Sequence, residues 1–296
     1  MLNKAPIFIN GFSYGGTNLI MNLIASHPDV CILSGETHEI FYGKPNKTID
    51  QLIRRAFYLP VLTLTLQHTF GRKCLDSRSK IPKPFLSYID LLFYIDKLIT
   101  GRKKSGYGDV NNAKRDIKNC RFLAKNVNGV VLATDVLSDV YPDATFIALV
   151  RNGLPLCEGY VRRRWTAEDF GRMYEKVCQK MIQDSKNLPN YHIVLFEEMV
   201  SDPLTLLKKI YSFTGLDINK ITKIRLQAKK SMDKNGTRKY TFGGIRDREI
   251  CWFPVVDIGN YIRSDVNENQ IIQLSEQNRS IFLHYAKNSM EYFGYI

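Results

Sequence analysis

The fold is decided by the stretch FINGFSYGGTNLIMNLI, which runs from Phe8 to Ile24. It starts as an apolar run of buried-strand character, passes through a loop that holds Gly11, Gly15 and Gly16, and continues into apolar residues at helical spacing. Glycines let the backbone approach a ligand, and the unpaired N–H groups and dipole of a helix N-terminus attract an anion. The stretch therefore predicts a strand, a turn and a helix start that bind a phosphate or a group shaped like one.

The spacing of Gly11 and Gly16 is also that of the P-loop that binds ATP. The next two positions are Thr17 and Asn18, where that loop has Lys and then Ser or Thr. In ATP-binding proteins this lysine contacts the phosphates and the hydroxyl binds Mg²⁺. The sequence therefore gives poor support to ordinary phosphoryl transfer.

Strand-like and helical patterns alternate along the rest of the chain. We expect strands at about 30–33, 121–129 with an exit loop, 144–150 and 191–199. Helices are expected at about 130–142, from Thr166 to Asp184, from 203 to a stop at Gly215, and, as one amphipathic helix, over 267–293. This alternation predicts an α/β fold with a parallel sheet flanked by helices and right-handed crossovers.

The length and composition set the domain organisation. With 296 residues, 44% of them hydrophobic, the chain can bury a large core. We predict one α/β domain over residues 1–296, with a helical and basic insertion over about 50–120. Apolar runs stay below the roughly 18 to 20 residues of a membrane span, the N-terminus lacks a secretory signal, and the six cysteines form no C-x-x-C pair. These features predict a cytoplasmic protein with reduced thiols.

The formal charge of +13 predicts anionic partners. Charge alone does not choose among a nucleotide, an acidic glycan, nucleic acid and the anionic surface of a membrane, so peripheral membrane contact stays open. A nucleic-acid binder is disfavoured because the basic residues are spread along the chain and form no recognised binding module.

Three segments, in order, resemble motifs of the PAPS-dependent sulfotransferases. FINGFSYGGTNLIMNLIASHPDV is similar to their 5′-phosphosulfate loop, G-x-x-R-S-G-T-T-x-L followed by S/A-H-P-x-V. YPDATFIALVRNGLPLCEGYVRR resembles their 3′-phosphate motif, and HIVLFEEMVSDPLTLLKKIYSFTGL resembles a later family segment. The resemblance implies a three-layer sandwich of P-loop NTPase type, a glycan or tyrosylprotein branch of the family, and PAPS as a sulfuryl donor used without a metal.

By this resemblance, the backbone around Gly15, Gly16, Thr17 and Asn18 would hold the 5′-phosphosulfate. Arg151, at a strand exit, would bind the 3′-phosphate through its planar guanidinium.

The chain departs from the family pattern at two of these positions. Tyr14 stands where a Lys or Arg usually precedes the S-G-T, and Gly159 stands where a serine hydroxyl usually contacts the 3′-phosphate. Basic residues could compensate for the missing groups. Lys125 follows a strand at the same edge of the sheet, and Arg238 lies in the basic tail, where the family closes over the nucleotide.

The loop SGETHEI resembles the G-E-E-T loop of tyrosylprotein sulfotransferases, whose second Glu is the catalytic base and aligns with Glu36. A carboxylate there can take the proton of an attacking hydroxyl. His38 is the alternative base, since many cytosolic members use a histidine. Lys125 would supply the catalytic cation.

The sequence and its resemblance to the family leave two candidate functions. The first is a sulfotransferase that moves a sulfuryl group from PAPS to a hydroxyl or amine of an unidentified acceptor, such as a glycan or another secondary metabolite. The alternative is a degenerate PAPS- or PAP-binding protein without transfer activity, which Tyr14 and Gly159 suggest.

Overall fold

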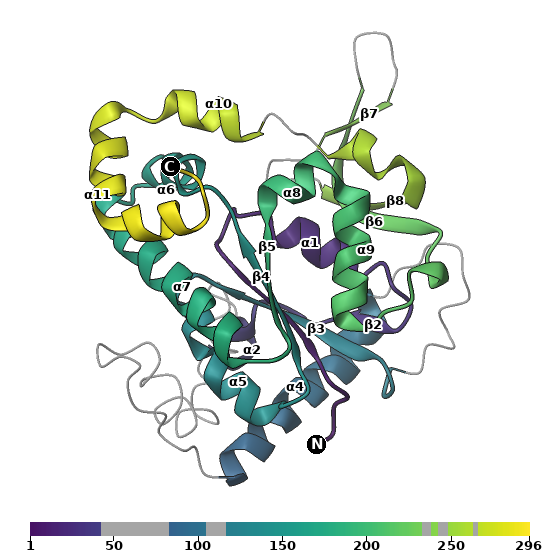
Figure 1. Cartoon of the computed structure of the whole chain (residues 1–296). Coiled ribbons are helices and arrows are strands. Elements are labelled where there is room, and N and C mark those ends of the chain that lie inside the picture. The colour runs from purple at the N-terminus through teal and green to yellow at the C-terminus, as the bar shows by residue number, and fades with distance from the viewer. Residues whose placement is uncertain (43–82, 105–116, 233–237, 242–247, 263–265) are drawn as a thin grey trace.

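The computed structural model of the chain describes residues 1–42, 83–104, 117–232, 238–241, 248–262 and 266–296 (Figure 1). Its centre is a five-stranded parallel sheet in the order β2-β3-β1-β4-β5. The strands are β1 (Ile7–Gly11), β2 (Val30–Ile32), β3 (Arg121–Val127), β4 (Thr145–Val150) and β5 (Tyr191–Leu195). This confirms the predicted parallel α/β fold.

Helices cover both faces of the sheet (Figure 1). They are α1 (Thr17–Ile24), α2 (Thr37–Tyr42), α4 (Lys83–Lys104), α5 (Thr134–Val140), α6 (Gly153–Val161), α7 (Ala167–Asn187), α8 (Phe196–Ser201), α9 (Pro203–Thr214), α10 (Val266–Gln273) and α11 (Glu276–Tyr292). Three short 3₁₀ helices are η2 (Asn128–Ala133), η3 (Ile218–Lys220) and η4 (Val255–Tyr261).

The core has two halves because successive side chains of a strand point to opposite faces of the sheet. Phe8 of β1 packs with α4, α5, α6, α7 and α11 on one face. Its neighbours Ile7 and Ile9 pack with α1, α8 and α9 on the other face. All three side chains are fully buried, so the apolar run that opens the chain lies at the centre of a three-layer sandwich.

Several predicted elements end at different residues from those expected. The strand predicted to reach residue 199 ends at Leu195, and α8 begins at Phe196 with Glu197 and Glu198 in its first turn. Carboxylates in the first turn of a helix are stabilised by the positive end of the helix dipole. The helix predicted over 130–142 begins as the 3₁₀ turn η2 and becomes α-helical at Thr134.

The C-terminal third differs most from the prediction. The single helix expected over 267–293 is two helices, because the side chain of Ser275 caps α11 by accepting from the Asn278 N–H. Upstream of them lies a three-stranded antiparallel sheet that the sequence reading missed, made of β6 (Lys223–Met232), β7 (Arg238–Thr241) and β8 (Arg248–Pro254) in the order β7-β6-β8.

The start of one helix and the end of another are confirmed at the residues that the sequence predicted. The Thr166 side chain accepts from the Asp169 N–H at the start of α7, and Gly215 ends α9 in the left-handed region at φ 64°.

Of the predicted insertion over about 50–120, α4 is helical. The remainder over 50–82 and 105–116 lies outside the described residues, so its extent stays a prediction. None of the helices in the described ranges is long and apolar enough to cross a bilayer.

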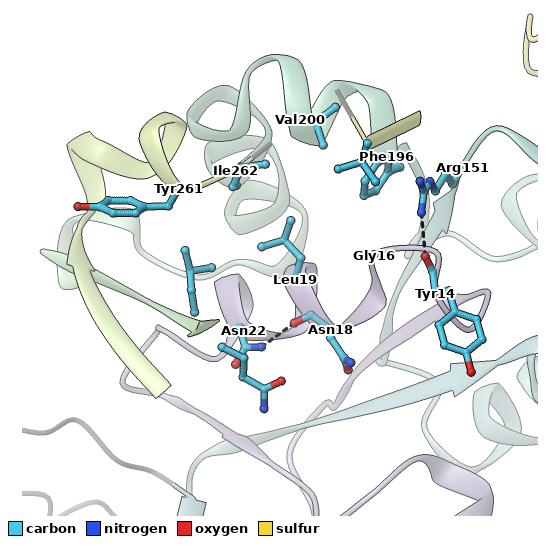
Figure 2. Close-up of a pocket in the computed structure, with 13 residues that line it drawn as sticks. Tyr14, Gly16, Asn18, Leu19, Asn22, Arg151, Phe196, Val200, Tyr261 and Ile262 are labelled. Carbon is cyan, nitrogen blue, oxygen red and sulfur yellow. Dashed lines mark hydrogen bonds between the residues drawn. The ribbon is translucent and has the colours of Figure 1, made fainter. Parts of the chain in front are cut away.

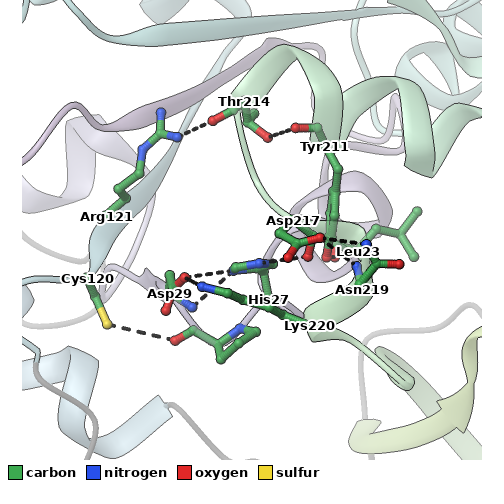
Figure 3. A network of polar contacts seen from close by, with 11 residues as sticks. Leu23, His27, Asp29, Cys120, Arg121, Tyr211, Thr214, Asp217, Asn219 and Lys220 are labelled. Carbon is green, nitrogen blue, oxygen red and sulfur yellow. Dashed lines mark hydrogen bonds and ion pairs between the residues drawn. The ribbon is translucent and has the colours of Figure 1, made fainter.

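A polar network ties the end of α1 to the segment after α9 (Figure 3). His27 is buried, its Nε2 lies 3.1 Å from the Asp217 carbonyl oxygen, and its Nδ1 accepts from the Asp29 N–H at 3.1 Å. These partners fit a neutral imidazole with its proton on Nε2. The Tyr211 hydroxyl also donates to the Leu23 carbonyl oxygen at 3.0 Å. The helix whose N-terminus faces the candidate site is thus anchored at its other end.

Candidate active site

The loop between β1 and α1 turns sharply just before the helix. The Gly15 N–H donates to the Phe12 carbonyl oxygen at 2.9 Å, and Tyr14 has a φ of 65°. Gly16 is the N-cap of α1 with a φ of 93°, and a Cβ built there would lie 2.6 Å from Cδ2 of Phe196. Both the backbone angle and the space at Gly16 therefore require glycine, and the first N–H groups of α1 are left without intrahelical partners.

Thr17 and Asn18, the first residues of α1, point to different surroundings. Thr17 is 4% exposed, and its methyl carbon would lie 2.6 Å from a Cβ built at Gly11. Its methyl group therefore packs against the end of β1. Asn18 is exposed, and its side-chain oxygen accepts from the Lys125 ammonium at 2.7 Å.

A first cavity of about 270 Å³ opens beside this loop (Figure 2). Its lining includes Tyr14, Gly16, Asn18 and Arg151. The rest of the lining is mainly apolar and comes from α1, α8, β6, η4 and α10 and the residues beside them: Leu19, Asn22, Phe196, Val200, Leu226, Gln227, Tyr261, Ile262 and Val266. The cavity therefore combines polar groups that suit an anion with apolar side chains that suit a flat ring.

Arg151 follows β4 and is buried at 4% exposure. Its Nη1 donates to the Tyr14 carbonyl oxygen at 2.9 Å, and its Cζ lies 4.4 Å from the centre of the Phe196 ring. Burial lowers the pKa of Arg151 to about 10, while the nearby Glu197 carboxylate raises it. The guanidinium is therefore still charged at neutral pH, within reach of the loop.

Helix α10 supplies two more partners of Arg151. The Arg151 Nε donates to the Asn267 side-chain oxygen at 2.8 Å, and its Nη2 donates to the Gln270 side-chain oxygen at 2.5 Å. A Cβ built at Gly159 would lie 3.7 Å from Nε2 of Gln270. Gly159 of α6 therefore borders the same region. Arg238, also expected at the nucleotide, begins β7, where it pairs with Met232 of β6.

The three predicted catalytic residues lie together. The Lys125 Nζ is 3.0 Å from Oε1 of Glu36, and the His38 Nδ1 is 3.6 Å from the other Glu36 oxygen, Oε2. Lys125 is 9% exposed at β3, beside β1 in the sheet. Because Lys125 also donates to Asn18, one buried ammonium connects the Glu36 carboxylate to the first turn of α1.

A second cavity of about 550 Å³ lies at this carboxylate. Its lining residues are Ser13, Glu36, His38, Val127, Asn128, Gly129, Val130, Trp165 and Met173. The loop after β1 thus lines both cavities, with Ser13 in the second and Tyr14 in the first. The two cavities therefore border the same loop.

The sequence reading missed two side chains near the loop. The Cζ of Arg163 lies 3.8 Å from the centre of the Tyr14 ring, so a cation stacks on the residue that replaces the expected loop cation. Asn128 accepts from the Ser13 N–H at 3.0 Å and from the Tyr160 hydroxyl at 2.7 Å. The run of three arginines at 162–164 was a sequence signal that could have indicated Arg163. Asn128 had no such signal, because only the fold brings it to Ser13.

Known proteins that are similar to this chain are sulfotransferases. The sulfotransferase family matches residues 6–220. The sulfotransferase domain from the curacin biosynthetic pathway is 14% identical, with a TM-score of 0.47, over 94% of this chain and 96% of that chain. Mouse sulfotransferase SULT7A1 complexed with PAP is 14% identical, with a TM-score of 0.43, over 97% and 84% of the two chains.

A further solved structure, the sulfotransferase domain of the Synechococcus PCC 7002 olefin synthase, is 15% identical, with a TM-score of 0.42, over 73% and 74% of the two chains. No curated protein matches the chain significantly. The family match spans more than half of the chain and extends from the start of β1 to the end of η3. The chain therefore belongs to the sulfotransferase family.

Proposed function

We propose that this sulfotransferase takes its sulfuryl group from PAPS and transfers it to a hydroxyl or amine of a small acceptor, such as a carbohydrate or another secondary metabolite. The observation that carries the proposal is the position of Lys125. Its ammonium contacts Asn18 at the first cavity and Glu36 at the second, at 2.7 and 3.0 Å. A donor at one side of the loop and an acceptor at the other would meet at this charge.

The first cavity fits the donor in three ways. The first turn of α1 offers N–H groups to the 5′-phosphosulfate, and Arg151 offers its fork to the 3′-phosphate. The side chains of Leu19, Leu226 and Ile262 line the remaining space, which suits the faces of an adenine. Arg163, stacked on Tyr14, adds a second guanidinium near the predicted 3′-phosphate position.

The second cavity fits the acceptor. Glu36 there would accept the proton of the attacking hydroxyl as the new oxygen–sulfur bond forms. The bond between sulfur and the leaving phosphate oxygen breaks at the same time, and PAP leaves with an additional negative charge. Lys125 and the N-terminus of α1 would stabilise that charge, which is often the largest catalytic contribution. His38, beside Glu36, remains the alternative base.

We also propose that residues of the segment over about 50–120 complete the acceptor site. The chain leaves the second cavity through α2, which starts at Thr37 between Glu36 and His38. A segment that begins beside the predicted catalytic residues is well situated to select the acceptor.

Binding of PAP tests the donor assignment directly. We expect calorimetry to detect PAP binding by the wild-type protein and a loss of about 100-fold in the Arg151→Ala variant, because a charge-assisted fork is removed. Arg151→Lys keeps the charge without the fork and should lose less. The matched control is Arg172→Ala, since Arg172 also stacks on a tyrosine, Tyr285, but pairs with Glu168 on α7. Equal PAP affinity in the Arg151 variants and the wild type would contradict the donor assignment.

A second candidate function is PAP binding without transfer. It is favoured by the loop itself, where Tyr14 carries no charge and is 51% exposed. Incubation with sulfur-labelled PAPS and a panel of hydroxyl and amine acceptors separates the two functions. Tight PAP binding with no labelled product, unchanged by Tyr14→Arg, would favour the binding protein, whereas labelled product that disappears in Glu36→Gln would favour the enzyme.

A further inference from the structure

Two side-chain amides of α10 occupy one edge of the Arg151 guanidinium. Asn267 and Gln270 are three residues apart, so they lie on one face of the helix. Their oxygens accept from Nε and Nη2 of Arg151 at 2.8 and 2.5 Å. Nε and Nη2 form the edge with which an arginine binds two oxygens of a carboxylate or phosphate. The two amide oxygens therefore stand where two oxygens of an anion would stand.

The orientation of both amides is set by carboxylates on their other side. The Asn267 Nδ2 donates to Glu197 at 2.7 Å, and the Gln270 Nε2 donates to Glu158 at 3.4 Å. Glu197 also accepts from the Tyr295 hydroxyl at 2.7 Å, which ties it to the C-terminus. Each amide thus presents its oxygen to the arginine and its NH₂ group to an acid.

The guanidinium has further partners beyond this edge. Nη1 donates to the Tyr14 carbonyl oxygen, the face packs on Phe196, and the whole residue is 4% exposed. A phosphate that binds Arg151 through its two-oxygen edge must therefore replace the amide oxygens of Asn267 and Gln270.

We propose that Asn267 and Gln270 set the affinity of the donor site by competing with the 3′-phosphate for Arg151. This inference rests on the proposed PAPS donor. In the contacts described above, the amides act as uncharged substitutes for the phosphate, and donor binding moves them off the guanidinium. None of the α10 side chains is fully buried, and Ile271 is a partly buried contact between α10 and the core.

The opposite role, in which the amides help to hold the phosphate, fits the contacts less well. To donate to a phosphate, each NH₂ group would have to leave its carboxylate, and Glu158 and Glu197 would then face a dianion without the amides between them. Competition avoids this repulsion, because α10 can move away with both amides.

The test compares PAP with adenosine 5′-phosphate, which lacks the 3′-phosphate. In calorimetry, Gln270→Ala and Asn267→Ala should each bind PAP about fivefold more tightly than the wild type, since each removes one competing hydrogen bond to a charged group. Their affinity for adenosine 5′-phosphate should stay the same, and this is the readout that a merely structural role would not produce. Gln273→Ala, an exposed glutamine on the same helix, should leave both affinities unchanged.

A second substitution at the same position should act in the opposite direction. Gln270→Glu places a carboxylate against Arg151, which competes more strongly than an amide, so PAP binding should weaken by about tenfold. Weaker PAP binding in Gln270→Ala as well as in Gln270→Glu would overturn the proposal, because it would make Gln270 a ligand of the phosphate.

The same data separate this inference from the donor assignment. If the wild type binds PAP and the alanine variants bind it no more tightly, competition by α10 is wrong and the donor assignment stands. If neither the wild type nor any variant binds PAP, the donor assignment fails and the inference fails with it.

Discussion

At the scale of single residues, the charge that Tyr14 lacks is supplied by neighbours in the fold. Arg163 stacks on the Tyr14 ring, and Lys125 reaches the other side of the loop through Asn18. Both cations come from parts of the chain distant in sequence, the turn after α6 and strand β3 respectively. A loop without its own cation is therefore still surrounded by positive charge, which is what a departing phosphate requires.

Lys125 should be needed for transfer more than for donor binding. Replacing it with Met keeps most of its length and removes its charge, so the transfer rate should fall by about 10²- to 10³-fold, as for other lost groups that stabilise developing charge. PAP affinity should change far less. The comparison is made by steady-state kinetics with labelled PAPS, beside calorimetry. Lys209→Met, at an exposed ion pair with Glu198, is the control, and an equal rate loss there would contradict the assignment.

Gly16 should not tolerate even one methyl group. Alanine at φ 93° is strained, and its Cβ would lie 2.6 Å from the Phe196 ring, so Gly16→Ala should lower the free energy of unfolding by about 1–3 kcal/mol. Urea denaturation measures this change. Gly259→Ala meets no atom within 4 Å and should be close to neutral.

The buried thiols should be chemically inert in the folded protein. Burial raises the pKa of Cys157 to about 12, with a smaller contribution from Glu158, and burial also raises the pKa of Cys178. At pH 8 both therefore remain protonated, and the thiol form is a poor nucleophile. Alkylation followed by peptide mass mapping should leave both unmodified until the protein is unfolded, while the partly exposed Cys251 reacts sooner.

At the scale of elements, the sequence predicted the parts whose pattern is local. The strands β1 and β4 are continuous apolar runs, and Thr166 and Gly215 are helix signals that act within a few residues. The antiparallel sheet of β6, β7 and β8 has no such signal, since its pairing joins residues as far apart as Lys223 and Pro254. For the same reason, the sequence did not indicate that α10 contacts Arg151, which lies more than a hundred residues earlier in the chain.

The link between α1 and the segment after α9 should contribute measurably to stability. His27→Ala removes both imidazole contacts, to the Asp217 carbonyl oxygen and the Asp29 N–H, and these two partly buried hydrogen bonds are lost at a cost of about 1–3 kcal/mol. Lys220→Ala breaks only an exposed ion pair with Asp29 and should cost less, because solvent screens such pairs. Chemical denaturation of both variants tests the difference. Equal losses would mean that the histidine does not anchor α1.

At the scale of the whole molecule, motifs predicted the donor side better than the acceptor side. The loop before α1 and Arg151 belong to segments that could be read directly, and each contains its own physical signal. The second cavity brings together Ser13, Asn128 and Trp165 from three separate parts of the chain. Only the fold unites them, and no pattern in the sequence specifies what they bind.

Donor binding should stabilise the entire sheet, because the first cavity is lined by residues from α1, β4, α8 and β6 or beside them. At PAP concentrations about 100 times the dissociation constant, the added stability is about 2.7 kcal/mol, which corresponds to a rise in Tm of about 4 °C for a chain of this length. A thermal-shift series with PAP measures it. Adenosine 5′-phosphate at the same concentration should produce a smaller rise, and an equal rise would mean that the 3′-phosphate is not recognised.

The position of Lys125 has one more consequence, for the order of events in catalysis. If the proposed donor and acceptor sites are correct, a single ammonium that touches both Asn18 and Glu36 links them thermodynamically. Whatever factor the donor imposes on the affinity for the acceptor, the acceptor must impose on the affinity for the donor. Acceptor titrations with and without saturating PAP should therefore give different dissociation constants, and Lys125→Met should make them converge. Such an enzyme would be sensitive to its own spent nucleotide, since PAP left in place would change how well the next acceptor is held.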